Sequence, residues 1–404
     1  MNPAPAPASP RLTSLDAFRG FDMFWILGAD SLVYALHGMS PNPVTRFLAL
    51  ELDHAEWAGF HFYDLIFPTF VFIMGVSTVF SLTRILEREG RPTAIRRILV
   101  RGLLLFILGL IYSGGLMKPW PDMRLMGVLN RIALCYVFGG LAFCFLRPRA
   151  LAVLAAALLL GYWALMALVP FPDVRPVPGA ETVITKETGF TDVGQLNMAS
   201  THMLRGSFVQ GVNLANYIDQ RYLPGRKYDG TYDPEGILST LPAFVTGLFG
   251  IFAGLLLRRQ DVPGERRAMI LIAAGFASVA VGLLWGLEFP VIKKLWTSSY
   301  VLVAGGCSSI LLGLFFWIID VRKITRWSRP FVWIGMNPIT LYMASALLGG
   351  FPDVAERLAG GSLSRFLDVH VAAGCGALAV SIVGVLLFVL LARFLYKRAI
   401  FIRL

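Results

Sequence analysis

Charged residues are scarce in this sequence of 404 amino acids, in which Asp, Glu, Lys and Arg together make up only 15%. Soluble domains carry about 25% charged residues. Hydrophobic residues reach 56%, and the mean hydropathy is +0.67. A soluble protein of this composition would need one very large core of nearly continuous apolar helices. The shortage of charge therefore excludes the class of ordinary soluble domains.

Cysteines are few, and none occurs in a pattern that binds metal. Cys135, Cys144, Cys307 and Cys375 all fall inside apolar blocks, so no loop disulfide is expected. The sequence has no CxxC motif and no Cys/His spacing typical of zinc, and we expect no metal cofactor. Residues 1–14 lack the apolar core of a signal peptide and are expected to form a disordered cytoplasmic tail.

Long apolar runs are what the sequence has in abundance. A helix needs roughly 20 apolar residues to cross the hydrocarbon core of a bilayer. Ten blocks approach this length: 17–38, 62–82, 98–116, 126–146, 149–170, 237–257, 268–288, 298–320, 330–349 and 372–396. They predict an all-α membrane protein, a polytopic bundle of about ten transmembrane helices in a single domain over residues 15–404.

The placement of basic residues predicts the orientation of this bundle. The net charge is +11, and most lysines and arginines gather on alternate loops, above all on the hairpin TRILEREGRPTAIRRILVR. Basic residues concentrate on the cytoplasmic side of membrane proteins. Both termini are therefore expected in the cytoplasm of a bacterial inner membrane, and the long loop 171–234 in the periplasm. Membrane lipid accounts for the basic excess, so no nucleic-acid partner is expected.

Several ionisable residues lie inside the first apolar block, where they are costly and usually functional. Asp16, Arg19, Asp22 and Asp30 fall on one stripe of this helix, which we expect to face the bundle interior. Asp16 and Arg19 are three residues apart and can pair, which would be a structural role. Asp30 lies near the outer end and is the stronger candidate for a function.

Polar residues also gather at the outer ends of five predicted helices. The stretch ELDHAEWAGFHFYDLIFP places His54, His61 and Asp64 at the start of the second helix. The other candidates for substrate binding are Asn130, Arg131, Asp233, Glu235, Trp296, Ser298 and Asn337. The acidic pair in YDPEG also suits a helix cap, and one or two of the others could join helices. So many polar groups at one depth predict a polar cavity.

Six motifs in one order resemble a known family. They are RLTSLDAFRGFDMFWILGAD, HAEWAGFHFYDLIFPTFVFIMG, GVLNRIALCY, YDPEGILST, KKLWTSSYVL and GMNPITLY. Together they closely resemble the bacterial relatives of heparan-α-glucosaminide N-acetyltransferase, from about Arg11 to Leu404. The resemblance implies transfer of an acetyl group from cytosolic acetyl-CoA to a glucosamine amine across the membrane. It implies that His54, not His61, is the essential histidine. It also matches Asp64 with the aspartate of the family motif and places Asp30 where the family has an asparagine.

The chemistry of this transfer fits the residues. Histidine is suited to removing an amine proton near neutral pH. A carboxylate can fix the tautomer of that histidine, and we expect Asp30 to be this carboxylate. Asn130, Asn337, Ser298 and Arg131 are all candidate donors to the developing oxyanion. Arg19 and Arg101 are candidates for holding the nucleotide of acetyl-CoA. Direct transfer and an acetyl-histidine intermediate both remain open, as does a homodimer.

The alternative function is a transporter of an amino sugar such as N-acetylglucosamine. A polar cavity and a helix broken at Pro338 are features of transporters. The sequence has no internal inverted repeat, and passive sugar binding does not require a histidine beside a carboxylate. Release of CoA from acetyl-CoA in the presence of glucosamine distinguishes the two functions.

Overall fold

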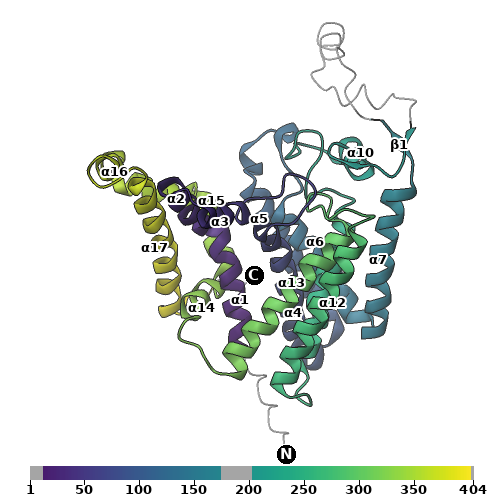
Figure 1. Ribbon diagram of the computed structural model, residues 1–404. Helices are drawn as coiled ribbons and strands as arrows, with labels where there is room; N and C mark the ends of the chain where they lie inside the picture. Colours follow the sequence, from purple (N-terminus) through teal and green to yellow (C-terminus); the bar gives the residue numbers. More distant parts are fainter. Residues whose placement is uncertain (1–11, 174–202, 402–404) are drawn as a thin grey trace, which may run out of the picture. The chain divides into compact units, whose positions relative to one another are not determined.

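The computed structural model describes residues 12–173 and 203–401. Residues 1–11 and 174–202, which hold most of the predicted tail and about half of the predicted loop, lie outside the described residues. The described chain is almost wholly helical (Figure 1). Its strands form two short antiparallel hairpins, in which Phe171–Pro172 (β1) pairs with Met203–Leu204 (β2) and Phe208–Val209 (β3) pairs with Val212–Asn213 (β4).

The protein is an all-α, polytopic membrane protein. Among the described residues, seven helices are long and apolar enough to cross a membrane, and a bent pair brings the number to as many as eight. The seven are Phe62–Arg88 (a first turn followed by α4, Ile66–Arg88), Val128–Phe145 (α6), Pro148–Leu168 (α7), Thr240–Arg258 (α11), Gly264–Trp285 (α12), Ser298–Val321 (α13, Ser298–Phe315, with a last turn) and Cys375–Lys397 (α17). The bent pair is Arg329–Gly335 (α14) and Pro338–Leu348 (α15), at 77°.

These spans match eight of the ten predicted blocks, and the other two blocks are less regular. The block 17–38 is divided into Thr13–Phe24 (α1) and Asp30–Met39 (α2) by a π-helical turn in which Gly28 has a φ of +108°. Most of the block 98–116 lies in Gly90–Tyr112 (α5), whose first half contains four arginines. The number of ten spans and the orientation stay predictions.

Shorter elements complete the described chain. The short helices are Trp25–Ala29 (η1, the π-helical turn), Pro43–Glu51 (α3), Phe62–Leu65 (η2), Gly115–Met117 (η3), Trp120–Asp122 (η4), Leu214–Tyr222 (α10) and Phe316–Val321 (η5), and a longer helix is Phe351–His370 (α16). The chain divides into two compact units, each described here by itself. Of the described residues, the first comprises 12–41, 261–272 and 310–401, and the second comprises 42–173, 203–260 and 273–309.

In the first unit, α1 and α14 meet backbone to backbone at two glycines. A Cβ atom on Gly20 would lie 1.7 Å from the carbonyl oxygen of Phe331, so only glycine permits this approach. Arg19 lies 3.5 Å from Asp16 and also donates to the carbonyl of Gly335, at 3.2 Å. The predicted pair of Asp16 with Arg19 is therefore confirmed, and it helps to hold the two helices together.

In the second unit, α4 and α11 are packed by the same kind of contact. A Cβ on Gly75 would lie 2.1 Å from the carbonyl oxygen of Gly247, and one on Gly250 would lie 1.9 Å from that of Phe72. Small residues let membrane helices approach closely and gain dispersion contacts. Near the ends of the two helices, Arg258 donates to Glu87 at 2.7 Å. The two helices therefore run in the same direction, and their first turns lie at the same end of the unit.

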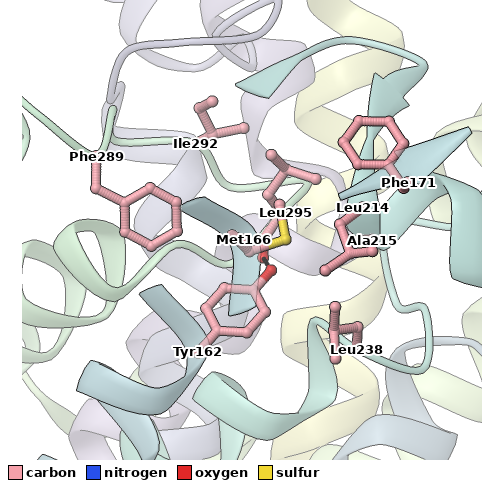
Figure 2. Close-up of a cluster of buried hydrophobic side chains, with 9 residues drawn as sticks. All are labelled: Tyr162, Met166, Phe171, Leu214, Ala215, Leu238, Phe289, Ile292 and Leu295. Atoms are coloured by element: carbon pink, nitrogen blue, oxygen red, sulfur yellow. Dashed lines mark hydrogen bonds between the residues drawn. The ribbon is translucent and has the colours of Figure 1, made fainter. Parts of the chain in front are cut away.

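A hydrophobic cluster fixes the loops at that end of the second unit (Figure 2). It joins α7, β1 and α10, which lie together in Figure 1, to the connector 286–297 between α12 and α13. The hydroxyl of Tyr162 donates to the carbonyl of Leu295 at 2.6 Å. Phe289, Ile292 and Leu295 are spaced three residues apart and all enter the cluster. The connector is therefore anchored, which positions the lysines and the tryptophan that it carries.

Candidate functional site

The loop that carries His54 is bound to the connector by backbone contacts. The N–H of Gly59 donates to the carbonyl of Val291 at 2.9 Å, and Ala58 forms an antiparallel bridge with Ile292. Trp57 donates from its indole to the carbonyl of Phe208, at 2.8 Å. These contacts bring together two segments far apart in sequence, and they place the connector's lysines beside the predicted histidine.

Asp64 is the centre of the site, in the first turn of the span Phe62–Arg88. Its side chain is only 1% exposed, and its Oδ1 lies 2.9 Å from Nδ1 of His54. Its Oδ2 accepts from the backbone N–H of Ala55 at 3.2 Å and of His61 at 3.1 Å. Tyr300 donates its hydroxyl to the Asp64 backbone carbonyl at 2.8 Å. A carboxylate only accepts, so this geometry requires the His54 proton on Nδ1.

Lys293 completes this cluster. Its Nζ lies 2.9 Å from Nδ1 and 3.1 Å from Nε2 of His54, and 3.4 Å from Oδ1 of Asp64. Burial lowers the pKa of Lys293, an effect that the neighbouring Asp64 and Glu235 offset only in part. The His54 side chain remains 48% exposed, so the ring is accessible from solvent. Sequence reasoning missed Lys293, although it lies in the motif KKLWTSSYVL.

His61 has a different place from His54. Its backbone N–H donates to Asp64, and its Nδ1 lies 3.1 Å from the carbonyl oxygen of Asp53. These contacts shape the loop around the carboxylate. Of the two histidines, the structure thus brings the His54 ring to Asp64. A half-exposed histidine, backed by a buried carboxylate, is an arrangement suited to removing a proton from a nucleophile.

Arg131 lies fully buried near the start of α6. Its Nη2 donates to the hydroxyl of Ser239 and to the carbonyl of Gly236, the latter at 3.3 Å. Its guanidinium carbon lies 4.9 Å from the ring centre of Trp296. Nε and Nη1 have no hydrogen-bond partner among the described residues. A buried guanidinium with unused N–H groups is suited to an anionic or carbonyl oxygen.

Asp233 and Glu235 are held by Arg124, which sequence reasoning missed. Arg124 donates to both Asp233 oxygens, at 2.8 and 2.7 Å, and also to Glu235. Burial raises the pKa of Glu235, although Arg131 and Arg124 oppose the shift. Asp233 also accepts from the backbone N–H of Glu235 at 3.0 Å, which is the capping role that the sequence allows. This acidic pair is therefore tied into the local fold.

Trp296 links the Arg131 region to Asp64. Its φ of +52° is rare for a residue other than glycine, and such strain persists only where the surroundings fix it. The indole N–H donates to Thr246 at 3.1 Å, and the ring lies 5.3 Å from that of Tyr300. Since Tyr300 also binds the backbone of Asp64, a chain of direct contacts joins Arg131 to the histidine.

Three further predicted residues in this unit have other contacts. Asn130 donates to the carbonyl of Phe106 at 2.9 Å, and its buried Oδ1 has no partner among the residues described. Ser298 donates to the carbonyl of Leu159 at 2.8 Å and thereby joins α13 to α7. Arg101 lies over the ring of Tyr136, at 5.1 Å from its centre.

The remaining predicted residues belong to the first unit. Asp30 begins α2 directly after the π-helical turn, Asn337 lies at the bend between α14 and α15, and Arg19 contacts Asp16. The predicted partnership of Asp30 with His54 stays a prediction. The contact at Nδ1 of His54 comes from Asp64.

Comparison with known proteins indicates a family. Residues 11–180 match the family model described as heparan-alpha-glucosaminide N-acetyltransferase, catalytic. The chain is 28% identical to the heparan-alpha-glucosaminide N-acetyltransferase of Homo sapiens over 434 residues and to that of Mus musculus over 440 residues. Both matches cover 97% of this chain, and the chain spans about 60% of the length of each relative. His54, Asp64 and Arg131 lie within the matched residues.

Proposed function

Because residues 11–180 match the family model described as heparan-alpha-glucosaminide N-acetyltransferase, catalytic, we propose that this protein is a membrane N-acetyltransferase. It moves the acetyl group of acetyl-CoA to the amine of a glucosamine-type sugar. The observation that carries the proposal is the contact of 2.9 Å between the buried Asp64 carboxylate and the half-exposed imidazole of His54.

His54 acts as the general base in this proposal. With its proton on Nδ1, the ring presents the lone pair of Nε2 to an incoming amine. The amine attacks the thioester carbonyl, His54 takes its proton, and Asp64 stabilises the imidazolium that forms. The proton then passes to the departing CoA thiolate. Direct transfer needs no covalent intermediate on the protein, and the buried Asp64 supports it by holding the ring fixed in the orientation of a base.

Arg131 and Trp296 form the proposed wall of the reaction site. The unused Nε and Nη1 groups of Arg131 supply donors for the carbonyl oxygen, which gains negative charge as the amine attacks. The Trp296 ring supplies an apolar face of the kind that packs against a sugar. Asp233 and Glu235 adjoin Gly236, whose carbonyl accepts from Arg131, so they are proposed to help position this wall. Asn130 and Ser298 remain further candidates for contact with substrate, as does Asn337 of the first unit.

The two substrates are proposed to arrive from opposite sides of the membrane. Asp64 lies at the start of the span Phe62–Arg88, and the hairpin with six arginines lies at its other end. At 1.5 Å per residue, the 23 residues of α4 separate these ends by about 34 Å, which is close to the thickness of a bilayer core. Acetyl-CoA would approach from the arginine end, where Arg101 is a candidate to hold its nucleotide, and Arg19 of the first unit stays a separate candidate.

A direct assay tests the proposal. Purified protein receives acetyl-CoA and glucosamine, and both CoA release and N-acetylglucosamine are measured. We expect both products with the unchanged protein, and a fall of about 10²–10⁴-fold in rate for His54→Ala. His61→Ala should keep most of the activity because its ring nitrogen Nδ1 lies against the backbone carbonyl of Asp53 and the contact of its backbone N–H with Asp64 is retained. Equal losses in both variants would contradict the role given to His54, and the absence of CoA release would favour transport of an amino sugar.

A further inference from the structure

In the proposed reaction, the amine of the acceptor sugar must lie beside His54. The amine of Lys293 occupies this position. General-base catalysis requires the attacking nitrogen within hydrogen-bond reach of the histidine, at about 2.6–3.2 Å. Nζ of Lys293 satisfies this condition, since it lies 3.1 Å from Nε2 of His54, the nitrogen that is free to accept a proton when Nδ1 donates to Asp64. Asp64 adds a carboxylate oxygen 3.4 Å from the same nitrogen. The histidine and the carboxylate together thus hold a primary amine.

The surroundings also favour the reactive form of this amine. An amine attacks a carbonyl only when it has lost its ammonium proton. Burial lowers the pKa of Lys293, and its side chain is 21% exposed, so it is sheltered but not fully enclosed. The backbone contacts between the loop 58–59 and the connector keep the lysine beside the histidine.

We propose that Lys293 is an internal acyl acceptor, which receives the acetyl group of acetyl-CoA when no sugar amine is bound. Nζ attacks the thioester carbonyl, so that a C–N bond forms and the C–S bond breaks, with its electron pair passing to sulfur. His54 takes the proton that Nζ loses and delivers it to the CoA thiolate. The ammonium proton that Lys293 gave up beforehand leaves to solvent. The products are CoA and N-acetyl-Lys293.

This inference rests on the proposed function, because it uses the same donor and the same base. It adds that a sugar amine and Nζ of Lys293 compete for one place beside His54. The amide formed on Lys293 is not an acyl donor, so the modified protein retains its acetyl group. An acceptor sugar should therefore protect the lysine from modification.

Lys294 provides a matched control in the same connector. It is the next residue, its side chain is 29% exposed, and its Nζ binds Asp229 at 2.9 Å rather than a histidine. Acetylation by simple chemical reaction with acetyl-CoA does not need His54 and would persist in His54→Ala. Acetylation by the site would select Lys293 over Lys294 and would depend on His54.

The experiment incubates purified full-length protein with acetyl-CoA alone and locates acetyl groups by peptide mass spectrometry. We expect modification of Lys293 and not of Lys294, a decrease when glucosamine is added, and an initial rate about 10²–10⁴-fold lower in His54→Ala. Lys293→Arg should remove the modification, and Lys294→Arg should leave it unchanged.

Three results would overturn the inference. One is equal modification of both lysines that persists in His54→Ala, which would indicate chemical acetylation. Another is an unmodified Lys293 in protein that acetylates glucosamine, which would leave the proposed function standing alone. The third is the absence of any acetyl transfer, to glucosamine or to protein, which would reject the inference together with the proposed function.

Discussion

Replacing Asp64 with asparagine should inactivate the protein by turning the proton of His54 to the wrong nitrogen. The carboxylate accepts from four donors: two backbone N–H groups on Oδ2, and His54 and Lys293 on Oδ1. The asparagine oxygen can keep the two backbone contacts, which leaves its NH₂ group facing Nδ1 of His54. Two donors cannot bind each other, so the imidazole must place its proton on Nε2.

A histidine with its proton on Nε2 cannot accept one from the substrate amine. We expect kcat to fall by about 10²–10⁴-fold, which corresponds to about 3–5 kcal/mol of activation free energy. The KM for glucosamine should change little, because Asp64 is buried behind the histidine. Initial rates of CoA release over a range of glucosamine concentrations separate the two parameters.

Asp53→Asn is the matched control for this prediction. Asp53 adjoins His54, is exposed, and accepts from the His54 backbone N–H at 2.8 Å, a contact that an amide oxygen can also make. We expect nearly unchanged kcat for this variant. If Asp64→Asn and Asp53→Asn were equally active, the tautomer of His54 would not depend on Asp64, and the reasoning would fail.

Three other predictions concern stability, which thermal unfolding in detergent measures. Gly250→Ala should be strongly destabilising because its Cβ would lie 1.9 Å from a backbone oxygen of α4. Gly161→Ala is the control, since its Cβ would meet no neighbouring atom within 4 Å, and it should be neutral or stabilising. Equal effects of the two substitutions would refute the close packing of α4 and α11. Burial raises the pKa of Asp219 from 3.8 to about 7, so the folded state retains this proton longer than the unfolded state, and stability should fall as pH rises from about 4 to about 7. Asp219→Asn should flatten that dependence, and an unchanged slope would contradict the assignment. Arg124→Lys should cost about 3–5 kcal/mol because a lysine cannot satisfy both buried carboxylates; a neutral effect would show that Asp233 and Glu235 need no bidentate partner.

The sequence predicts the membrane helices well where an apolar run is uninterrupted. The runs that become α4, α6, α7, α11, α12, α13 and α17 need only length and hydropathy to be recognised. The break at Gly28 was not predicted, because a π-helical turn depends on how the chain packs there and not on composition. The first half of α5 contains four arginines, so this helix is less apolar as a whole than its second half.

The candidate site divides in a similar way. His54 and Asp64 are ten residues apart in one motif, so their meeting lies within reach of sequence reasoning. Lys293 lies 239 residues from His54, and Arg124 lies 109 residues from Asp233. Contacts over such separations depend on helix packing and on the anchored connector, and a single sequence contains no direct signal for them. The predicted partnership of Asp30 with His54 stays a prediction, and the contact of Asp64 with Nδ1 of His54 is observed.

Transfer across a sealed bilayer tests the central proposal most directly. The protein is reconstituted into vesicles that enclose glucosamine, and acetyl-CoA is added only to the outside. The account predicts N-acetylglucosamine inside the vesicles and CoA outside, in equal amounts, and neither product with His54→Ala. Product that forms only when both substrates are on the same side, or N-acetylglucosamine that crosses the bilayer without release of CoA, would contradict it.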